Sequence, residues 1–352
     1  MRCKVSGVRS KILASSFWIL VAGFCLPAHA IEFQMPIKCD LGKDCFIQNY
    51  VDTSKTPGEY KDYKCGSMTY PHHTGTDFRI PDYVRMREGV DVLAAADGKV
   101  ERVRDSMADI SIRQTDPATI KKAECGNAVI ISHGQGWQTS YCHMKRGSIV
   151  VKPGQQVKAG EKLGQVGLSG DTEFPHVHFE VRHNGKVIDP FTQDQPGWGC
   201  NAVSGLDHSL WYPPAREKLA YNPTALLSAG FANGEPNEDA ALDGQYNNLQ
   251  FPPNAKFMVL WAEMMGVQKD DELMLQIIAP DGHEIFSKQA DFPKNKATVF
   301  FYAGSKLLMN AWRPGTYKGR IILIRKTPSG ETNTIFDETR ELAVKSLTTL
   351  PE

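Results

Sequence analysis

The chain has 352 residues, which is enough for two domains of ordinary size. Hydrophobic residues make up 41% of it and charged residues 23%, as is usual for globular proteins. The first 30 positions hold four basic residues and no acidic one, so the rest of the chain has 36 basic and 40 acidic residues, a net charge of −4. Because nucleic-acid binding requires a basic surface, this balance argues against a nucleic acid as partner.

The first 30 residues have the pattern of a secretory signal peptide. Basic positions precede an apolar run at 12–26, and residues 28–30 have the small-x-small form of a cleavage site. The apolar run is shorter than the roughly 20 residues that span a membrane, and no later segment is long enough. A lipid anchor at Cys25 is less favoured, because the large residue Phe24 precedes it. We therefore expect cleavage near Ala30, a periplasmic or secreted protein, and no transmembrane segment after cleavage.

Six cysteines remain after that cleavage, at positions 39, 45, 65, 125, 142 and 200. An even number in an exported chain favours disulfides. Cys39 and Cys45 flank a short turn, so we expect them to form a local pair. We further expect the pairs 65–125 and 142–200. Zinc ligation by the thiols is the alternative, but the chain has no C-x-x-C motif that would favour it.

Strand patterns and turns divide the mature chain into four segments. Residues 31–70 are polar and turn-rich, which indicates a disulfide-stapled N-terminal extension. Residues 71–195 consist of short β patterns and turns, which predict a compact antiparallel β domain. Residues 196–245 lack periodicity and indicate a linker. Residues 246–352 predict a C-terminal β-sandwich of Ig-like type, so the fold class is all-β. Its strand patterns lie at 257–264, 272–279, 284–288, 297–303, 316–326 and 334–344.

Within residues 71–195, two patterns place histidines on strands. The predicted strands 127–133 and 137–144 flank a Gly-Gln-Gly turn and form a hairpin, with His143 near the end of the second strand. Another strand begins at His176. Because side chains alternate along a strand, His176 and His178 leave the same face, while Val177 points to a core. The polar stretch 104–124 interrupts the strand pattern and predicts a surface loop.

Histidine is concentrated in this part of the chain, where seven of the ten histidines fall between positions 72 and 183. His73 and Asp77 are separated by Gly75, whose conformational freedom permits a turn that brings both side chains to one point. With His176 or His178 they supply the three protein ligands of a catalytic zinc site. Each motif alone also fits a surface pair, and spacing does not decide which histidine of the second motif binds metal.

The order of these motifs resembles that of the lysostaphin-like (LytM-type) zinc metallopeptidases, a family of peptidoglycan endopeptidases. The resemblance covers residues 70–192. It rests on an H-x-G-x-D motif, a glycine-rich core, a strand-end histidine, an H-x-H motif and a final Asp-Pro. In this chain these elements occupy residues 73–77, 97–100, 126–131, 141–144, 152–155, 164–167, 175–180 and 189–190.

The resemblance implies a duplicated-hybrid-motif β fold and a role for each site residue. The cofactor it implies is Zn²⁺, with His73, Asp77 and His178 as metal ligands. It implies His143 and His176 as the catalytic pair, which would assist the attack of a zinc-bound water on a peptide bond.

Three further expectations concern the surroundings of the site. Glu180 is expected to orient a ligand imidazole rather than to act as the base. The histidines at 72, 133 and 183 are expected to be structural or exposed. The chain departs from the family pattern at Tyr70 and Pro71, where an arginine is common, and in the length of residues 104–124. Neither departure removes a ligand, so activity is expected, and the long loop is expected to shape the substrate groove.

The sequence thus predicts an exported zinc metalloendopeptidase that hydrolyses peptide cross-links of peptidoglycan. The sequence does not specify which bond is cut: an oxidising periplasm suits a D-alanine-to-diaminopimelate cross-link, and a glycine bridge and a protein substrate are the alternatives. The alternative is a non-catalytic envelope scaffold or regulator that binds peptidoglycan or a protein partner. A third hypothesis assigns binding of peptidoglycan or an envelope protein to the C-terminal domain, through Trp261 or Trp312, although tryptophans in a sandwich are more often core residues. A further hypothesis is that residues 31–65 lie across the groove and restrain activity.

Overall fold

The computed structural model describes residues 31–201, 205–327 and 329–346. The expected signal peptide, residues 1–30, lies outside the described residues. The described residues from Glu32 onward form one compact unit. Within the described ranges, no helix combines the length and the apolar composition that a membrane crossing requires.

Ten strands and three short helices lie between residues 46 and 190. The strands are β1 (Phe46–Asn49), β2 (Thr76–Arg79), β3 (Asp91–Leu93), β4 (Gly98–Arg104), β5 (Asn127–Gly134), β6 (Trp137–Met144), β7 (Gln156–Val157), β8 (Lys162–Gln165), β9 (His176–His183) and β10 (Lys186–Ile188). The helices are α1 (Tyr83–Glu88), η1 (Ile112–Gln114) and α2 (Pro117–Ile120). The last two lie within the predicted surface loop 104–124.

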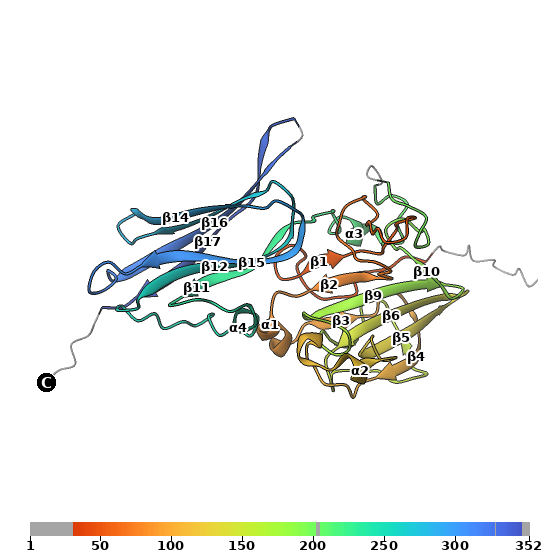
Figure 1. The fold of residues 1–352 in the computed structure, drawn as a ribbon. Coiled ribbons are helices and arrows are strands. Elements are labelled where there is room, and N and C mark those ends of the chain that lie inside the picture. The colour runs from red at the N-terminus through yellow and green to blue at the C-terminus, as the bar shows by residue number, and fades with distance from the viewer. Residues whose placement is uncertain (1–30, 202–204, 328, 347–352) are drawn as a thin grey trace, which may run out of the picture. The chain divides into compact units, whose positions relative to one another are not determined.

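Most of these strands form one antiparallel sheet of eight strands, which confirms the predicted β architecture (Figure 1). Its order is β1-β2-β9-β6-β5-β4-β7, with β10 beside β9, while β3 pairs with β8 in a separate sheet. The predicted hairpin is present as β5 and β6, joined through Gly134 and Gly136, which have positive φ angles of 79° and 81°. In β9, Val177 and Phe179 are fully buried, so the alternate positions 176 and 178 face away from that core, as predicted.

The segment predicted as an N-terminal extension contributes the edge strand of this sheet. β1 lies in that segment and pairs with β2, which places Asn49 opposite Asp77. Directly after β1, the ring of Tyr50 packs edge-on against Tyr63 and Phe191, with centroids 5.2 and 5.1 Å away. Tyr50 and Tyr63 are each 1% exposed. Residues on both sides of position 71 therefore share one hydrophobic core.

Three disulfides connect the six cysteines of the described part of the chain. They are Cys39–Cys45, Cys65–Cys200 and Cys125–Cys142. The local pair was predicted, but the predicted pairs 65–125 and 142–200 are wrong. Cys125 comes just before β5 and Cys142 lies on β6, so the pairing of these two strands itself brings the two sulfurs together. Cys65 and Cys200 are 135 positions apart, and only the folded chain reveals that they are neighbours.

The remaining strands form two sheets. They are β11 (Ala225–Ala232), β12 (Phe257–Val267), β13 (Glu272–Ile278), β14 (Glu284–Asp291), β15 (Lys296–Lys306), β16 (Gly315–Lys326) and β17 (Thr332–Val344), with helices α3 (Pro213–Arg216) and α4 (Glu238–Leu242) before β12. One sheet has the order β11-β12-β15 and the other β14-β13-β16-β17. All six predicted strands are present, and β11 arises within the predicted linker.

Both of these sheets contribute to one hydrophobic core. Leu260 of β12 and Leu275 of β13 are fully buried members of it, as is Leu323 of β16. Along β13, buried and half-buried residues alternate, so one face of the sheet points inward. A core shared by two sheets is what the predicted β-sandwich requires.

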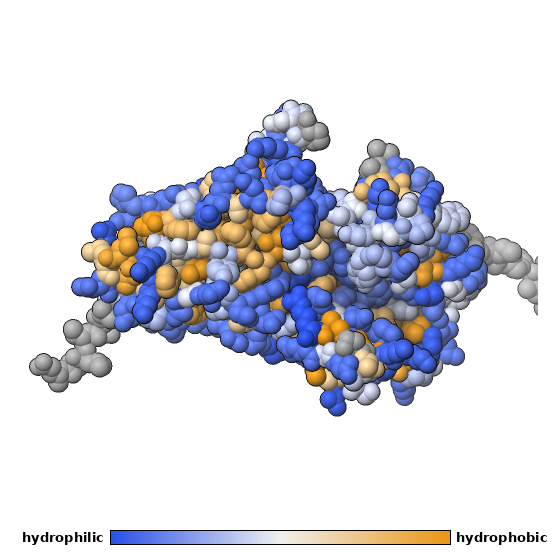
Figure 2. Space-filling view, viewed as in Figure 1, coloured by the Kyte–Doolittle hydropathy of each residue, from blue (hydrophilic) through white to orange (hydrophobic). Residues whose placement is uncertain are grey.

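The tryptophans considered as contact residues of this region lie in its interior. Trp261 is 2% exposed and Trp312 is 8% exposed, so both are core residues, as was the more expected outcome, and the hypothesis that they are contact residues is wrong. The indole nitrogen of Trp312 donates a hydrogen bond to the carbonyl oxygen of Ala255, at 2.8 Å. Large exposed apolar side chains occur instead at Leu308 and Met309. Figure 2 shows hydrophobic patches interspersed with hydrophilic residues on the viewed face.

Candidate metal site and its surroundings

Three side chains expected to bind metal meet at one point. Asp77 on β2 pairs with His178 on β9, and His73 lies in the turn before β2. Nε2 of His73 lies 3.1 Å from Oδ1 of Asp77 and 3.1 Å from Nδ1 of His178. The same Nδ1 of His178 lies 2.9 Å from Oδ1 of Asp77. These three donor atoms are close enough together to hold one metal ion.

Gly75 is required by close packing rather than by an unusual backbone turn. Its φ is not among the positive angles that many other glycines of the described chain adopt. A Cβ atom at position 75 would lie 2.6 Å from Nε2 of His178 and 2.7 Å from the carbonyl oxygen of Phe179. Such distances are shorter than real Cβ contacts. The predicted role of Gly75 in backbone freedom is therefore corrected: the missing side chain makes room for the imidazole of His178.

The ligand side chains are held from behind by two residues that the sequence analysis missed. The main-chain carbonyl of Tyr50 accepts a hydrogen bond from Nδ1 of His73 at 2.7 Å. The side-chain amide of Asn49 donates to Oδ2 of Asp77 at 2.9 Å. Neither residue belongs to a recognisable motif, and both reach the site only because β1 pairs with β2. These bonds fix the orientation of His73 and Asp77 and leave Nε2 and Oδ1 toward the ion position.

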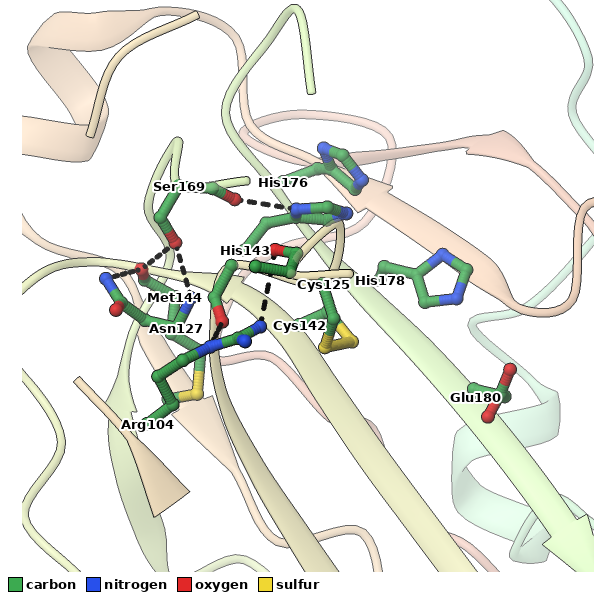
Figure 3. The surroundings of a disulfide bond; sticks show 12 residues. Arg104, Cys125, Asn127, Cys142, His143, Met144, Ser169, His176, His178 and Glu180 are labelled. Atoms are coloured by element: carbon green, nitrogen blue, oxygen red, sulfur yellow. Dashed lines mark hydrogen bonds between the residues drawn. A yellow bond between two sulfur atoms is a disulfide. The ribbon is translucent and has the colours of Figure 1, made fainter. Parts of the chain in front are cut away.

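Glu180 does not orient a ligand imidazole, contrary to the prediction. Its two carboxylate oxygens accept hydrogen bonds from the guanidinium of Arg182 at 2.6 and 3.1 Å. Two residues along a strand correspond to about 6.6 Å, which carries Glu180 past His178. Figure 3 shows Glu180 farther along β9, away from the imidazoles.

His143 reaches the site because a β-bulge interrupts β6. Asn127 pairs with Met144, but the next pair is Val129 with Tyr141, so β6 has one residue more than β5 between these pairs. A bulge of this kind re-aims a side chain. His143 lies within it and has a φ of 60°, in the left-handed region that residues other than glycine seldom adopt.

The bulge turns the imidazole of His143 toward the other histidines. Its ring centroid lies 4.6 Å from that of His176 and 6.0 Å from that of His178. Nδ1 of His143 donates to the main-chain carbonyl of Ser169 at 2.8 Å, as Figure 3 shows. This bond places the remaining proton on Nδ1 and leaves Nε2 as the unprotonated nitrogen of a neutral ring.

His176 is oriented in the same way. Its Nδ1 lies 3.0 Å from the main-chain carbonyl of Phe174 and 3.1 Å from the hydroxyl of Thr172. Its Nε2 lies 3.4 Å from Oδ1 of Asp77, on the side of the ligands. The structure therefore places both predicted catalytic histidines beside the three predicted ligands.

Burial and neighbouring charges set the ionisation of the site. Burial, with the nearby His176 and His178, holds the pKa of His143 well below its ordinary value. Burial opposes the charged forms of Asp77 and His73, but the attraction between them is stronger, so the pKa of Asp77 is well below and that of His73 above its usual range. The site thus combines an ionised carboxylate with a neutral His143.

The other histidines of this part of the chain are structural or exposed, as expected. His133 bridges the carbonyl oxygen of Asp97 and the hydroxyl of Thr139, at 2.7 and 2.8 Å. The ring of His183 stacks on Trp137 with centroids 4.2 Å apart. His72 is exposed.

The site opens into a cleft of about 490 Å³. Asp77, His143 and His176 are among its lining residues, together with Arg113 from the long loop 104–124. Tyr70, which stands where the family often has arginine, also lines it and packs on His73 with ring centroids 4.4 Å apart.

Residues 71–190 match the sequence pattern of Peptidase family M23. The matching segment contains all three candidate ligands and both candidate catalytic histidines. These residues are therefore similar to the peptidase domain of family M23. This finding confirms the resemblance to the lysostaphin-like zinc metallopeptidases that the motifs indicated.

Curated relatives resemble this chain over the same region. An uncharacterized metalloprotease of Haemophilus influenzae is 33% identical over 132 residues, which cover 38% of this chain and 23% of that protein. The peptidoglycan DD-endopeptidase ShyB of Vibrio cholerae is 34% identical over 124 residues, which cover 35% and 24% respectively. The chain thus spans about a quarter of the length of these two relatives.

Peptidases of known structure also resemble this chain in sequence. A zinc-containing peptidase from Vibrio cholerae is 29% identical, with 43% of this chain and 41% of that chain covered and a TM-score of 0.28. The catalytic domain of the prophage-encoded M23 protein EnpA from Enterococcus faecalis is 28% identical, with 46% and 95% covered and a TM-score of 0.29. At such TM-scores the likeness carries no argument about the arrangement of the whole chain.

Proposed function

We propose that the chain is an exported zinc metalloendopeptidase that hydrolyses peptide cross-links of peptidoglycan. One observation carries the proposal: the donor atoms of His73, Asp77 and His178 lie 2.9–3.1 Å apart, and the imidazoles of His143 and His176 border them. This arrangement joins a metal-binding set to two groups that transfer protons.

The donor set fits zinc in type, number and spacing. Zinc in proteins binds imidazole nitrogen and carboxylate oxygen at about 2.0–2.2 Å. The donor atoms of the three residues lie 2.9–3.1 Å apart, close enough for one ion to bind all of them. Three protein ligands leave one coordination position for a water or substrate, as in catalytic rather than structural zinc sites. Hydrogen bonds from His73 to the carbonyl oxygen of Tyr50 and from Asn49 to Asp77 orient the side chains of these two candidate ligands, as hydrogen bonds to the ligands do in zinc sites.

The chain's own residues supply the proton transfers. When bound, zinc would supply Lewis-acid chemistry that lowers the pKa of a water molecule to about 7. His143 keeps its proton on Nδ1, bonded to Ser169, so its Nε2 can accept a proton from the attacking water. His176 is held through Nδ1 in the same manner and faces the same space. Together the two imidazoles offer a base and a partner for the oxygen on which negative charge develops.

Relatives and composition support the substrate and the compartment. ShyB carries the name peptidoglycan DD-endopeptidase, and Mpg of Neisseria meningitidis, 32% identical over 130 residues, the name DD-carboxypeptidase/endopeptidase. The proposed bond is the D-alanine-to-diaminopimelate cross-link. Three disulfides in the described residues suit an oxidising compartment such as the periplasm. The signal-peptide pattern of residues 1–30 supports export.

Digestion of purified peptidoglycan tests the proposal. The products are separated and identified by mass spectrometry, with and without a chelator, using the chain that lacks residues 1–30. We expect cross-linked muropeptide dimers to be converted to monomers, the chelator to prevent this, and added zinc to restore it. Cleavage of glycan strands instead of peptides, or full activity in the chelator, would contradict the proposal.

A further inference from the structure

We propose that the Cys125–Cys142 disulfide is a redox-controlled positioning element for catalysis. With the bond intact, His143 is held in its catalytic place; with the bond reduced, turnover is lost while the metal ligands stay in place. This inference rests on the proposed function of the site. It assigns a role in the reaction to two residues that neither bind metal nor transfer protons.

The disulfide lies directly beside the catalytic histidine. Cys142 pairs with His178 across β6 and β9, so its side chain leaves the sheet on the face that carries this ligand. The next residue is His143, whose main-chain N–H donates to the carbonyl oxygen of Cys125 at 2.8 Å. The S–S bond, which Figure 3 shows, and this hydrogen bond together tie the bulge of β6 to the segment before β5.

The segment that contains Cys125 packs tightly on the loop at residues 169–171. The main-chain N–H of Asp171 donates to the carbonyl oxygen of Glu124 at 2.7 Å. The N–H of Asn127 donates to the hydroxyl of Ser169 at 2.8 Å. A Cβ atom on Gly126 would lie 2.1 Å from the carbonyl oxygen of Ser169, so the two backbones touch. Any displacement of the Cys125 segment is therefore passed to this loop.

That loop, extended to position 172, orients both catalytic imidazoles. The carbonyl oxygen of Ser169 accepts from Nδ1 of His143, and the hydroxyl of Thr172 contacts Nδ1 of His176 at 3.1 Å. A continuous series of contacts thus runs from the disulfide to the two groups that transfer protons. The orientation of the imidazoles depends on a segment that the disulfide anchors.

The conformation of His143 needs this support. A φ of 60° at a residue with a side chain persists only where its surroundings hold it. The ligands His73 and Asp77 are held independently, by Tyr50 and Asn49 of the β1 region. The third ligand, His178, faces Cys142 on one side but is also paired with Asp77 of β2 on the other, with Nδ1 2.9 Å from Oδ1 of Asp77. Loss of the disulfide therefore loosens the proton-transfer groups and leaves the metal ligands in place.

Reduction of the bond is chemically simple and sterically feasible. Cys125 is half-buried, whereas Cys142 is 6% exposed, so a reductant approaches the bond from the side of Cys125. A dithiol reductant attacks one sulfur and then closes to its own disulfide. The S–S bond of the protein gains two electrons and two protons and becomes two thiols, and a disulfide oxidant reverses the step.

A pair of double variants tests the inference in the full mature chain. In C125S/C142S we expect kcat for release of dye-labelled peptides from peptidoglycan to fall by about 100-fold, the loss that a misplacement near 1 Å causes. The KM and the zinc content per protein should stay at the wild-type level. The matched control C39S/C45S removes the other local disulfide and should keep the wild-type kcat. Unchanged kcat in C125S/C142S, or zinc lost together with kcat, would overturn the inference.

A second measurement decides the question without using activity, and also applies if the variant fails to fold. The Nδ1 proton of His143, bonded to Ser169, should give a slowly exchanging downfield signal in NMR of histidine-labelled protein, assigned by its absence in H143Q. We expect this signal to disappear from wild-type protein treated with dithiothreitol, in step with alkylation of Cys125 and Cys142. Its persistence in the reduced protein would overturn the inference. The signal can depend on the disulfide in this way while the oxidised protein cleaves no peptidoglycan. In that case the proposed function fails and the positioning role stands.

Discussion

Nε2 of His73 lies 3.1 Å from Nδ1 of His178, although 105 positions separate these residues in the chain. Asp77 accounts for this proximity, because it lies four positions after His73 and pairs with His178 across β2 and β9. The metal-binding set therefore depends on one turn and one strand pair. Changes that disturb either should affect metal binding before they affect the rest of the fold.

The first prediction concerns Gly75. In Gly75→Ala the added methyl group would meet the imidazole of His178 at 2.6 Å, so the ring must move away from the other ligands. We expect zinc affinity to fall by at least about 10-fold, as when a ligand's support is lost. Competition with a chromophoric chelator measures the affinity. The control is Gly234→Ala, where a Cβ meets nothing within 4 Å. Equal zinc affinity in both variants would show that the imidazole of His178 does not need the space beside Gly75 in order to bind zinc.

The second prediction concerns Asn49, which holds Asp77 through a hydrogen bond of 2.9 Å. In Asn49→Ala the outer oxygen of Asp77 loses this donor in a buried setting, so the carboxylate is less well oriented toward the ion. We expect zinc affinity to fall by about 10- to 100-fold. Isothermal titration with zinc tests this, with the exposed Asn248→Ala as control. An unchanged affinity in Asn49→Ala would contradict a role for β1 in the site.

The third prediction concerns pH. Asp189 is fully buried, and burial raises the pKa of its carboxyl group to about 7. The folded chain therefore binds this proton more tightly than the unfolded chain does, so the associated stability is present in acid and is lost as pH rises from about 4 to 7. A shift of about three pKa units corresponds to about 4 kcal/mol.

Asp189→Asn removes this titration and keeps an acceptor for the N–H of Phe191, which Asp189 now binds at 2.9 Å. Urea unfolding of both proteins at several pH values measures the difference. We expect the stability of the variant relative to the wild-type protein to increase between pH 4 and 7. A difference that stays constant over this range would show that Asp189 titrates normally.

Periodicity and motif spacing predicted much of the fold. The hairpin of β5 and β6 was predicted because its apolar residues flank a glycine turn. The strand β9 was predicted with its histidines on one face, because alternation along a strand depends only on local geometry. The C-terminal strands were predicted for the same reason. The ligand set and the catalytic pair were named from the family resemblance, and the structure brings these five residues together.

Features that depend on distant pairing were not predictable in this way. Asn49 and Tyr50 support the ligands, but only the register of β1 against β2 brings them there. The bulge at His143 comes from a mismatch between two strands, which neither strand shows alone. Glu180 was misassigned because its charge suggested a role that its distance along β9 does not permit. The wrong disulfide pairs have the same origin, since cysteine spacing does not specify which strands are neighbours.

The most direct test of the account compares metal content and activity in two variants. His178→Ala removes a proposed metal ligand, whereas His143→Ala removes a proposed proton-transfer group that lies outside the proposed ligand set. Zinc per protein is measured by elemental analysis, and release of soluble muropeptides from purified peptidoglycan is measured on the same samples. We expect His178→Ala to lose both zinc and activity, and His143→Ala to keep zinc while its activity falls by about 10²- to 10⁴-fold. Full activity in either variant, or loss of zinc from His143→Ala, would contradict the assignment of the site.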